Sequence, residues 1–440
     1  MMKSDNIQIR RGIKRMKTVF MAATLLVMVC LVGCGTEDHV NKDSETTAAV
    51  QPGVEDDGNG IDAQGKDQEN SDGGEQVDQT KPPEQTVAPT AEPAAEVDRS
   101  AVFELFSHMT VGWNLGNTFD SIGAGNTLSS ETYWGNPKTT KEMIDAISEQ
   151  GINTVRIPVT WAEHVGSAPE YTISEEWLDR VEEVVDYCLD DGMYVILDTH
   201  HEPDFWMSLA EEDMENTKAE LRAIWTQVAE RFQDRDEHLL FEGMNEPRTK
   251  GSANEWNGGT GLERVAVNEL NGVFIDAVRA VGGNNADRCL IICTYGNNAS
   301  TVTLQNLKFY NDPNIAVAVH MYSPYFFTYD ADGGYSEWDG SKRSDFTGTI
   351  RLLDSFLIKK GMPVIVTEFG AVNKENTEEV IKWINDYLGA MNEYGIRCVW
   401  WDNGNYTNPG EKFGIFDRRN LTWYSQEIAD ALVEAAAQVQ

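Results

Sequence analysis

Basic residues are scarce in this sequence: its 440 residues include 35 Lys and Arg against 72 Asp and Glu, which gives a formal net charge of −37. A protein that binds nucleic acid presents a positive surface to the phosphate backbone, so this balance argues against DNA or RNA as a partner. An acidic surface keeps a protein in solution and does not repel a neutral polymer. The charge therefore excludes one class of ligand and leaves uncharged ligands open.

Cysteine is also scarce, and the six residues follow neither a metal-binding nor a disulfide pattern. Cys30 and Cys34 lie in an N-terminal apolar segment, and the others lie in stretches that predict a helix or a strand. Residues 289 and 293 would lie about 13 Å apart on one strand, too far for a disulfide. We expect four buried free thiols, at Cys188, Cys289, Cys293 and Cys398.

Long hydrophobic runs are absent except for an uncharged, largely apolar stretch at 18–33, which is too short to span a membrane comfortably. Basic residues between Lys3 and Lys17 precede it, as in a signal peptide. The stretch ends in Leu31-Val32-Gly33-Cys34, which resembles a bacterial lipoprotein processing box. By that resemblance, residues 1–34 are a lipoprotein-type signal and Cys34 carries a lipid that anchors an extracellular protein to the cell surface. The alternative is an ordinary cleaved signal and full secretion.

Residues 35–100 lack Phe, Trp, Tyr and Leu, and they carry 17 acidic against 4 basic side chains, a balance of −13. Such a segment cannot bury enough apolar surface to offset the entropy lost on ordering. Its like charges repel one another and extend the chain. We therefore expect a disordered acidic linker that holds a folded domain away from its anchor.

From residue 101 to 440, short apolar runs alternate with amphipathic helical patterns. Apolar strands separated by helices imply a parallel sheet, and eight such units predict a single (β/α)8 TIM barrel. An open doubly wound sheet is the alternative, but 112–117 is a poor version of the glycine-rich loop it needs. The predicted strands are Thr110–Leu115, Thr154–Pro158, Tyr194–Asp198, Leu239–Met244, Cys289–Thr294, Ile315–His320, Val364–Thr367 and Cys398–Trp401. The predicted helices are Lys138–Gln150, Glu175–Asp190, Glu220–Gln233, Gly261–Val281 and Thr377–Tyr394.

Polar and aromatic residues stand at nearly every predicted strand end. The active sites of such barrels are built at the C-terminal ends of the strands. Each residue alone has an ordinary explanation as a cap or a satisfied core group. Their convergence on one rim predicts a functional site, formed by Asn114, Arg156, His200, His201, Asn245, Glu246, His320, Tyr322, Glu368 and Trp401.

Two of these residues are carboxylates in settings that suit catalysis. Glu246 directly precedes Pro247, which disfavours a helical backbone for its predecessor and so fixes where Glu246 points. Glu368 ends an apolar strand, where an unpaired carboxylate costs desolvation free energy, so it needs a partner such as Arg156. The sequence therefore predicts a pair of catalytic carboxylates.

Several segments together resemble glycoside hydrolase family five, the largest family that contains cellulases. The similarity spans about 101–440 and is closest to the branch of endoglucanases, lichenases and xyloglucanases. It implies a retaining double displacement on a β-1,4-linked glucan. The matching segments are Gly112-Trp113-Asn114-Leu115-Gly116-Asn117, Trp134-Gly135-Asn136-Pro137, Asp198-Thr199-His200-His201-Glu202, Asn245-Glu246-Pro247, His320-Met321-Tyr322, Thr367-Glu368-Phe369-Gly370 and Trp400-Trp401-Asp402-Asn403-Gly404.

The resemblance implies that Glu368 is the nucleophile and that Glu246 is the general acid and base. A retaining pair lies about 5–5.5 Å apart, which strand ends four and seven of one barrel can supply. Burial and the neighbouring carboxylate should raise the pKa of Glu246 so that it keeps its proton. Arg156 and Tyr322 should keep Glu368 ionised.

The resemblance also implies roles in sugar binding. Asn245 would bind the 2-hydroxyl, His320 would position Glu246, and Trp401 would lie beneath the sugar ring. His200, His201 and Asn114 would bind other hydroxyls. Flat aromatic faces suit the apolar faces of sugars, so aromatic residues in the loops either extend the cleft or pack in the core: Trp134, Trp161, Trp206, Trp256, Tyr325 and Phe327.

Two other classes of protein are alternatives. A metal hydrolase could use His200, His201, Glu202 and His320, but adjacent histidines on an extended segment point to opposite sides and would share one metal poorly. A non-catalytic glycan-binding lipoprotein would not need two carboxylates at strand ends four and seven. We expect an endo-β-1,4-glucanase, with lichenase, xyloglucanase and β-mannanase as open alternatives. We also expect a monomer without metal or cofactor, whose membrane contact is the lipid at Cys34.

Overall fold

The computed structural model describes residues 97–331 and 333–438. The predicted signal segment, including Cys34, and most of the predicted acidic linker lie outside these residues and stay predictions. Among the residues that the structure describes, none of the helices combines the length and apolar character needed to cross a bilayer.

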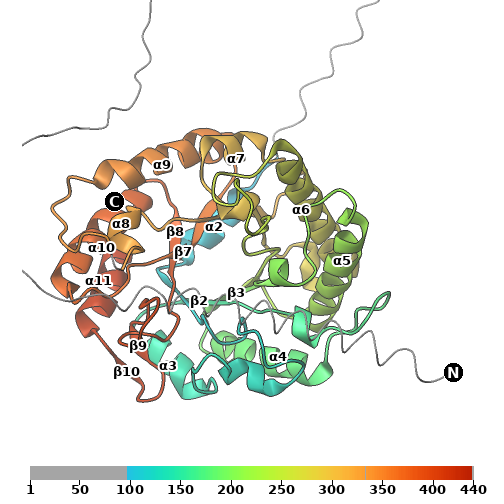
Figure 1. Cartoon of the computed structure of the whole chain (residues 1–440), viewed down its shortest axis with the longest axis horizontal. Coiled ribbons are helices and arrows are strands. Elements are labelled where there is room, and N and C mark those ends of the chain that lie inside the picture. Colours follow the sequence, from blue (N-terminus) through green and yellow to red (C-terminus); the bar gives the residue numbers. More distant parts are fainter. Residues whose placement is uncertain (1–96, 332, 439–440) are drawn as a thin grey trace, which may run out of the picture. The chain divides into compact units, whose positions relative to one another are not determined.

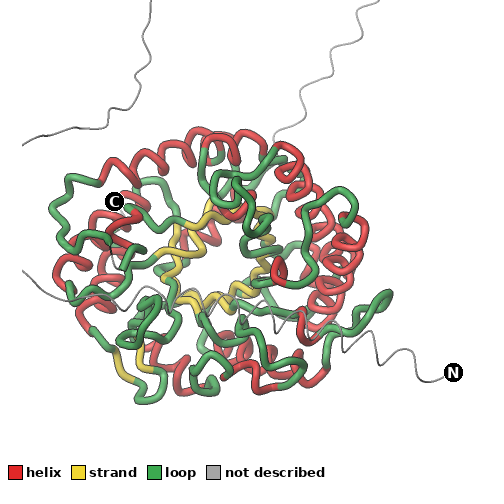
Figure 2. Tube along the Cα trace, viewed as in Figure 1, coloured by secondary structure: helices red, strands yellow, loops and turns green. Residues whose placement is uncertain are grey.

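Eight parallel strands close into a barrel in sequence order, with β1 paired to both β2 and β8. Figure 2 shows this ring of strands inside a ring of helices. The predicted (β/α)8 barrel is confirmed, and the open sheet is excluded because the first and last strands pair. The strands are β1 Gly112–Asn114, β2 Thr154–Ile157, β3 Tyr194–Asp198, β4 Leu239–Glu242, β5 Leu290–Cys293, β6 Ile315–His320, β7 Val364–Phe369 and β8 Arg397–Trp400.

Amphipathic helices cover the outer face and one end of the barrel (Figure 1). The longer ones are α2 Ser100–His108, α3 Lys141–Glu149, α4 Glu175–Asp190, α5 Met214–Arg231, α6 Gly261–Val281, α9 Arg343–Phe356, α10 Thr377–Asn392 and α11 Gln426–Ala437. Short helices are α7 Thr301–Asn306 and α8 Tyr325–Thr328, and 3₁₀ turns are Leu128–Thr132, Ala162–His164, Glu202–Asp204, Gly283–Ala286, Tyr295–Asn297 and Ile358–Lys360. A small hairpin joins β9 Phe416–Asp417 to β10 Thr422–Trp423.

Helices α4 and α6 and strands β3 and β6 have the predicted bounds, whereas α2, α7, α8, α9 and α11 were not predicted. Helix α2 begins at Ser100, one residue before the start predicted for the folded domain. The side chain of Asp98 accepts a hydrogen bond from the Ser100 amide at 2.9 Å, and buried Arg99 donates to the carbonyl of Tyr310 at 2.7 Å.

The core has two layers, one inside the barrel and one between the strands and the helices. Inside the barrel, Val102 and Phe106 of α2 belong to the same cluster as Tyr194, at the start of β3, and Ile365 of β7. Arg397, at the start of β8, also donates to the carbonyl of Phe106 at 2.7 Å. Helix α2 therefore closes the N-terminal end of the barrel, and the opposite end is left for the site. The four expected free cysteines are indeed free and buried: Cys188, Cys289, Cys293 and Cys398.

Candidate active site

A cleft of about 720 Å³ lies over the C-terminal ends of the strands. It brings together most of the residues that the sequence singled out, from strands three, four, six, seven and eight or the loops that follow them. Asn114, Arg156, His320 and Trp134 are not part of its lining. The lining residues are His200, His201, Asn245, Glu246, Arg248, Trp256, Tyr322, Tyr325, Tyr329, Glu368, Trp401 and Glu411.

Arg156 lies fully buried beneath the cleft and binds three carboxylates. Its guanidinium lies 2.6 Å from Glu242, 2.7 Å from Asp198 and 2.9 Å from Glu368. Burial lowers the pKa of Arg156, but the charges of Glu242, Asp198 and Glu368 outweigh burial and hold that pKa above its ordinary value. The expected contact between Arg156 and Glu368 is confirmed.

Asn114 does not face the cleft, so its predicted contact with sugar hydroxyls is wrong. Its side chain is fully buried and donates to the carbonyls of Thr367 at 3.0 Å and Trp400 at 3.1 Å. Its amide oxygen accepts from Arg156 at 3.0 Å. Because these bonds occupy both the nitrogen and the oxygen of the amide, Asn114 positions Arg156 instead of binding a sugar. Arg156, which the sequence also placed in the functional site, lies beneath the cleft and does not line it, so it is too deep to contact a substrate.

Glu368 is bound on both carboxylate oxygens. Arg156 contacts Oε1 at 2.9 Å, and the hydroxyl of Tyr322 donates to Oε2 at 3.0 Å. Burial and the charge of Glu368 raise the pKa of Tyr322 well above its ordinary value, so the phenol keeps its proton and remains a donor. The contacts with Arg156 and Tyr322 that the sequence predicted are both present, and they hold the Glu368 carboxylate in one orientation.

Glu246 has two basic neighbours. Nδ1 of His320 lies 2.8 Å from Oε1, and Arg248 lies 3.1 Å from Oε2. Burial raises the pKa of Glu246, but the hydrogen bond and charge of His320 and the charge of Arg248 outweigh burial and lower that pKa. The expectation of a raised pKa is therefore wrong for the free protein, because it counted burial and Glu368 but not these two neighbours.

His320 holds its proton on the side that faces Glu246. Burial lowers the pKa of His320, but Glu368 and Glu246 outweigh burial and raise it. Its other ring nitrogen lies 3.2 Å from the amide nitrogen of Asn297, which donates. That bond disfavours a second proton on Nε2, so Nδ1 carries the proton shared with Glu246.

The two carboxylates come close to each other. Glu246, His320 and Glu368 each offer an atom within 4.8 Å of the others. That spacing is compatible with the separation of about 5–5.5 Å between the carboxyl groups of a retaining glycosidase and is shorter than the roughly 6.5–9.5 Å of an inverting one.

The backbone after β4 is packed tightly, and this fixes Glu246. A Cβ on Gly243 would lie 2.5 Å from Phe274 of α6, so only glycine allows this approach. The carbonyl of Gly243 accepts hydrogen bonds from Trp225 at 2.9 Å and Thr199 at 2.8 Å. Close packing against α6 therefore holds the segment after β4, which carries Glu246, in one position at the C-terminal end of the barrel.

The two adjacent histidines do not point apart, which corrects the sequence prediction. His201 follows β3 at φ −91° and ψ 29°, outside the extended region, and its ring centroid lies 4.6 Å from that of His200. Burial lowers the pKa of each imidazole to about 3, with smaller contributions from Arg156 for His200 and from His200 for His201. Both are therefore neutral, and with Asp120 they offer donor atoms within 4.8 Å of one another. The geometric argument against a metal fails, and the absence of a metal remains a prediction.

Aromatic residues divide between the cleft and the core. Trp256 and Tyr325 line the cleft and are 58% and 55% exposed. Trp134 is half exposed and lies beside His201, with centroids 5.6 Å apart. Trp401 stacks parallel to His200 at 5.7 Å. The remaining candidates do not line the cleft, because Trp161 and Phe327 are core residues and Trp206 binds Glu202.

Several site residues were missed. Asp198 and Glu242 end buried strands, which is the same signal that identified Glu368. Arg248 stands next to the motif of Glu246 and was given no role. Tyr329 and Glu411 come from loops in which the sequence shows no periodic pattern.

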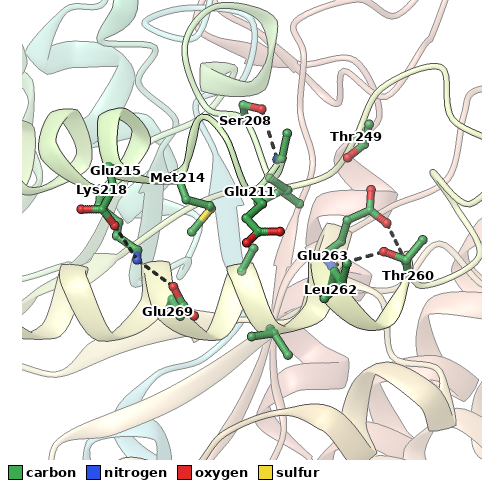
Figure 3. A pocket seen from close by; sticks show the side chains of 14 residues that line it. Ser208, Glu211, Met214, Glu215, Lys218, Thr249, Thr260, Leu262, Glu263 and Glu269 are labelled. Atoms are coloured by element: carbon green, nitrogen blue, oxygen red, sulfur yellow. Dashed lines mark hydrogen bonds and ion pairs between the residues drawn. The ribbon is translucent and has the colours of Figure 1, made fainter.

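A second groove of about 680 Å³ lies outside the barrel, between α5 and α6 (Figure 3). Lys218 pairs there with Glu215 and Glu269, and Glu263 forms a capping box with Thr260 at the start of α6. These charged groups satisfy one another or cap the helix. The groove contains none of the predicted site residues, so the cleft is the candidate active site.

Comparison with known proteins gives consistent matches. The family model described as cellulase (glycosyl hydrolase family 5) matches residues 116–407. Endoglucanase A of Ruminococcus albus is 47% identical over 352 residues, which cover 78% of this chain and 95% of that protein.

Solved structures agree. A xyloglucan-specific endo-β-1,4-glucanase from a metagenomic library, in complex with cellotriose, is 56% identical, with a TM-score of 0.76 over 77% of this chain and 99% of that one. A broad-specificity endoglucanase from Ruminococcus champanellensis with bound cellotriose is 44% identical, with a TM-score of 0.73 over 75% of this chain and 97% of that one.

Asn114→Ala should destabilise the fold. The change removes a partner of buried Arg156 and the donor to two carbonyls, so we expect the free energy of unfolding to fall by about 1–3 kcal/mol. Urea unfolding measures this difference. Asn385→Ala, on the exposed face of α10, is the control and should leave stability unchanged or slightly higher, since alanine favours helix. Equal stability of Asn114→Ala and wild type would contradict the positioning role.

Proposed function

The chain belongs to the cellulase family, glycosyl hydrolase family 5, and on that premise we propose that Glu368 and Glu246 cleave internal β-1,4 bonds of a glucan with retention. The observation that carries the proposal is the spacing of the two carboxylates, whose nearest atoms lie within 4.8 Å. Their different neighbours, a cation and a phenol for Glu368 and an imidazole for Glu246, assign the roles.

In the first step Glu368 attacks the anomeric carbon. A bond forms between that carbon and a carboxylate oxygen, and the glycosidic bond breaks. Arg156 and Tyr322 each bind one oxygen of the attacking carboxylate and hold it oriented before the reaction. Glu246 gives its proton to the leaving oxygen.

The acid role of Glu246 requires a proton that the free protein does not hold on this carboxylate. The Nδ1–H of His320, 2.8 Å away, is the nearest source, so the pair shares the proton and delivers it as negative charge develops on the leaving oxygen. In the second step water attacks the anomeric carbon, the bond to Glu368 breaks, and ionised Glu246 takes the proton of the water. The lowered pKa of Glu246 suits this second step.

The cleft residues bind the sugars. Asn245 accepts from Arg156 at 2.8 Å, which orients its amide toward the 2-hydroxyl beside the nucleophile. Trp401 presents its face beneath the ring at the cleavage point, and neutral His200 and His201 bind hydroxyls. Trp134 extends the aromatic surface past His201. No step of this mechanism needs a metal or an organic cofactor.

The preferred glucan is proposed as the cellulose type, with mixed-linkage glucan, xyloglucan and β-mannan as alternatives. The relatives described as endoglucanases support a β-1,4-glucan. A panel of carboxymethyl-cellulose, barley β-glucan, xyloglucan, glucomannan and xylan, scored for reducing ends, tests this order. Activity confined to xylan or mannan refutes it.

We also propose that the protein works as a monomer outside the cell, anchored by a lipid on Cys34. The basic start, the apolar run at 18–33 and the Leu31-Val32-Gly33-Cys34 segment support this localisation. The acidic composition of 35–100 suits a tether between anchor and enzyme.

Glu368→Gln should abolish hydrolysis of barley β-glucan, by at least about a thousandfold in kcat, because the nucleophile is lost. Binding of cellotriose, measured by calorimetry, should persist because the cleft keeps its shape. Glu211→Gln, in the groove outside the barrel, is the matched control and should retain full activity. Unchanged release of reducing ends by Glu368→Gln would refute the assignment.

Arg248→Gln should move the alkaline limb of the kcat/KM–pH profile to higher pH. Arg248 lowers the pKa of Glu246, so its removal lets the pair of Glu246 and His320 keep the proton to a pH higher by about one unit. Arg248→Lys keeps the positive charge and should leave the limb near its wild-type position. A uniform loss of kcat/KM at every pH, with both limbs in place, would show that Arg248 is only structural.

Cys34→Ser should release the enzyme from the membrane fraction, because the thiol that accepts the lipid is gone. Detergent phase partitioning of cells that express each form measures this change. A wild-type protein found wholly in the culture medium, with the same partitioning as Cys34→Ser, would favour the ordinary cleaved signal.

A further inference from the structure

Arg248 is held by three residues of its own loop, the segment that follows β4. Its guanidinium carbon lies 4.5 Å from the ring centroid of Trp256, over the face of the ring. Its Nε donates to Glu255 at 3.1 Å, and its Nη1 donates at 3.1 Å both to the carboxylate and to the backbone carbonyl of Glu246. One guanidinium therefore joins Trp256 and Glu255 to the carboxylate that is proposed as acid and base.

Trp256 presents one face to Arg248 and leaves more than half of its side chain open to solvent. The face of an indole carries partial negative charge, so it attracts a planar guanidinium. The ring also covers Arg248, whose side chain is mostly buried. With less water around it, the positive charge of Arg248 acts more strongly on Glu246.

Glu255, the residue before Trp256, is itself fixed. Its second carboxylate oxygen accepts a hydrogen bond from the amide of Gly251 at 2.6 Å. Gly251 has φ +74°, a backbone conformation that favours glycine, and this turn returns the chain toward Arg248. The carboxylate of Glu255 therefore holds Arg248 in place and also offsets part of its charge.

Several titratable groups face Glu246 and Arg248. Burial lowers the pKa of the two adjacent histidines to about 3 and raises the pKa of the two tyrosines, so these four groups are uncharged at neutral pH. Arg248 keeps its charge at every working pH, so its position decides how far it offsets burial, which raises the pKa of Glu246. The groups around Arg248 are Glu246 and Glu255, with Lys250 close to Glu255. The groups around Glu246 are His200, His201, His320, Tyr322, Tyr329 and Glu368.

We propose that Trp256 and Glu255 are positioning residues for the acid and base, because they hold the guanidinium of Arg248 in a fixed place beside Glu246. This proposal rests on the role of Glu246 in the function proposed above. Trp256 keeps the positive charge close to Glu246 and shielded from water, and Glu255 offsets part of that charge. The two residues therefore act in opposite directions on the pH at which the pair of Glu246 and His320 loses its proton.

Two substitutions should move the alkaline limb of the kcat/KM–pH profile on barley β-glucan in opposite directions. Trp256→Ala should move it to higher pH by about half a unit, because a hydrated and mobile Arg248 lowers the pKa of Glu246 less. Glu255→Gln should move it to lower pH, because the charge of Arg248 is no longer offset. A tryptophan that only bound sugar would change KM and leave the limb in place.

Control variants separate the cation–π contact from packing and from sugar binding. Trp256→Phe keeps a flat ring over the guanidinium and should hold the limb near its wild-type position, whereas Trp256→Leu keeps apolar bulk and should move it as Trp256→Ala does. Tyr325→Ala removes a similarly exposed ring of the same cleft, which stacks on Tyr329 at 5.6 Å, and should raise KM with the limb in place. In an Arg248→Gln background, Trp256→Ala should not move the limb further, because the charge through which Trp256 acts is absent.

The outcomes separate this proposal from the one it rests on. If wild type hydrolyses barley β-glucan but the limb stays in place in either Trp256→Ala or Glu255→Gln, the positioning role is overturned and the proposed function stands. An equal shift by Trp256→Ala with and without Arg248 also overturns it, because Trp256 would then act by another route. Wild type that hydrolyses no β-glucan refutes the proposed function, and this proposal with it.

Discussion

The active-site rim depends on one buried cation. Arg156 rises from β2 and contacts carboxylates at the ends of β3, β4 and β7, with Asn114 of β1 and Asn245 as neutral partners. Without the arginine, three carboxylates would share a site with little water, and the desolvation and repulsion would have no compensation. The same contacts that neutralise this charge orient Glu368, the proposed nucleophile. The contacts of Arg156 therefore stabilise the C-terminal end of the barrel and place Glu368 at the same time.

Charge also explains the difference between the two carboxylates. Burial acts on both, but Glu246 sits between an imidazole and a guanidinium, and Glu368 sits between a guanidinium and a phenol. A group that must give a proton and later take one needs a partner that can hold that proton in the meantime. His320 meets that need, since the amide of Asn297 occupies its far nitrogen and keeps its proton toward Glu246.

The sequence was sufficient to predict the barrel, its strands and the position of Glu246 and Glu368 at the C-terminal ends of the strands, because apolar strands followed by acids are a strong local signal. The sequence was insufficient to predict which residues lie beneath the site and which line the cleft. Asn114 is the last residue of β1 and lies under the site, whereas Asn245 lies beyond the end of β4 and lines the cleft. The predicted strands ended one residue after the first asparagine and one residue before the second, so the sequence did not reveal this difference in depth. Trp161 and Phe327 were indistinguishable from Trp256 and Tyr325 for the same reason. The pKa of Glu246 depended on residues brought together from β6 and from the loop after β4, which local patterns do not reveal.

Helix α2 makes the two ends of the barrel different. It seals the end of the barrel opposite the cleft, and Arg99 and Arg397 fasten it there through the carbonyls of Tyr310 and Phe106. The polypeptide therefore enters the catalytic domain through its closed base. The start of the described chain and the strand ends that carry the cleft therefore lie at opposite ends of one barrel, so the contacts that hold α2 do not compete with the cleft for the same loops.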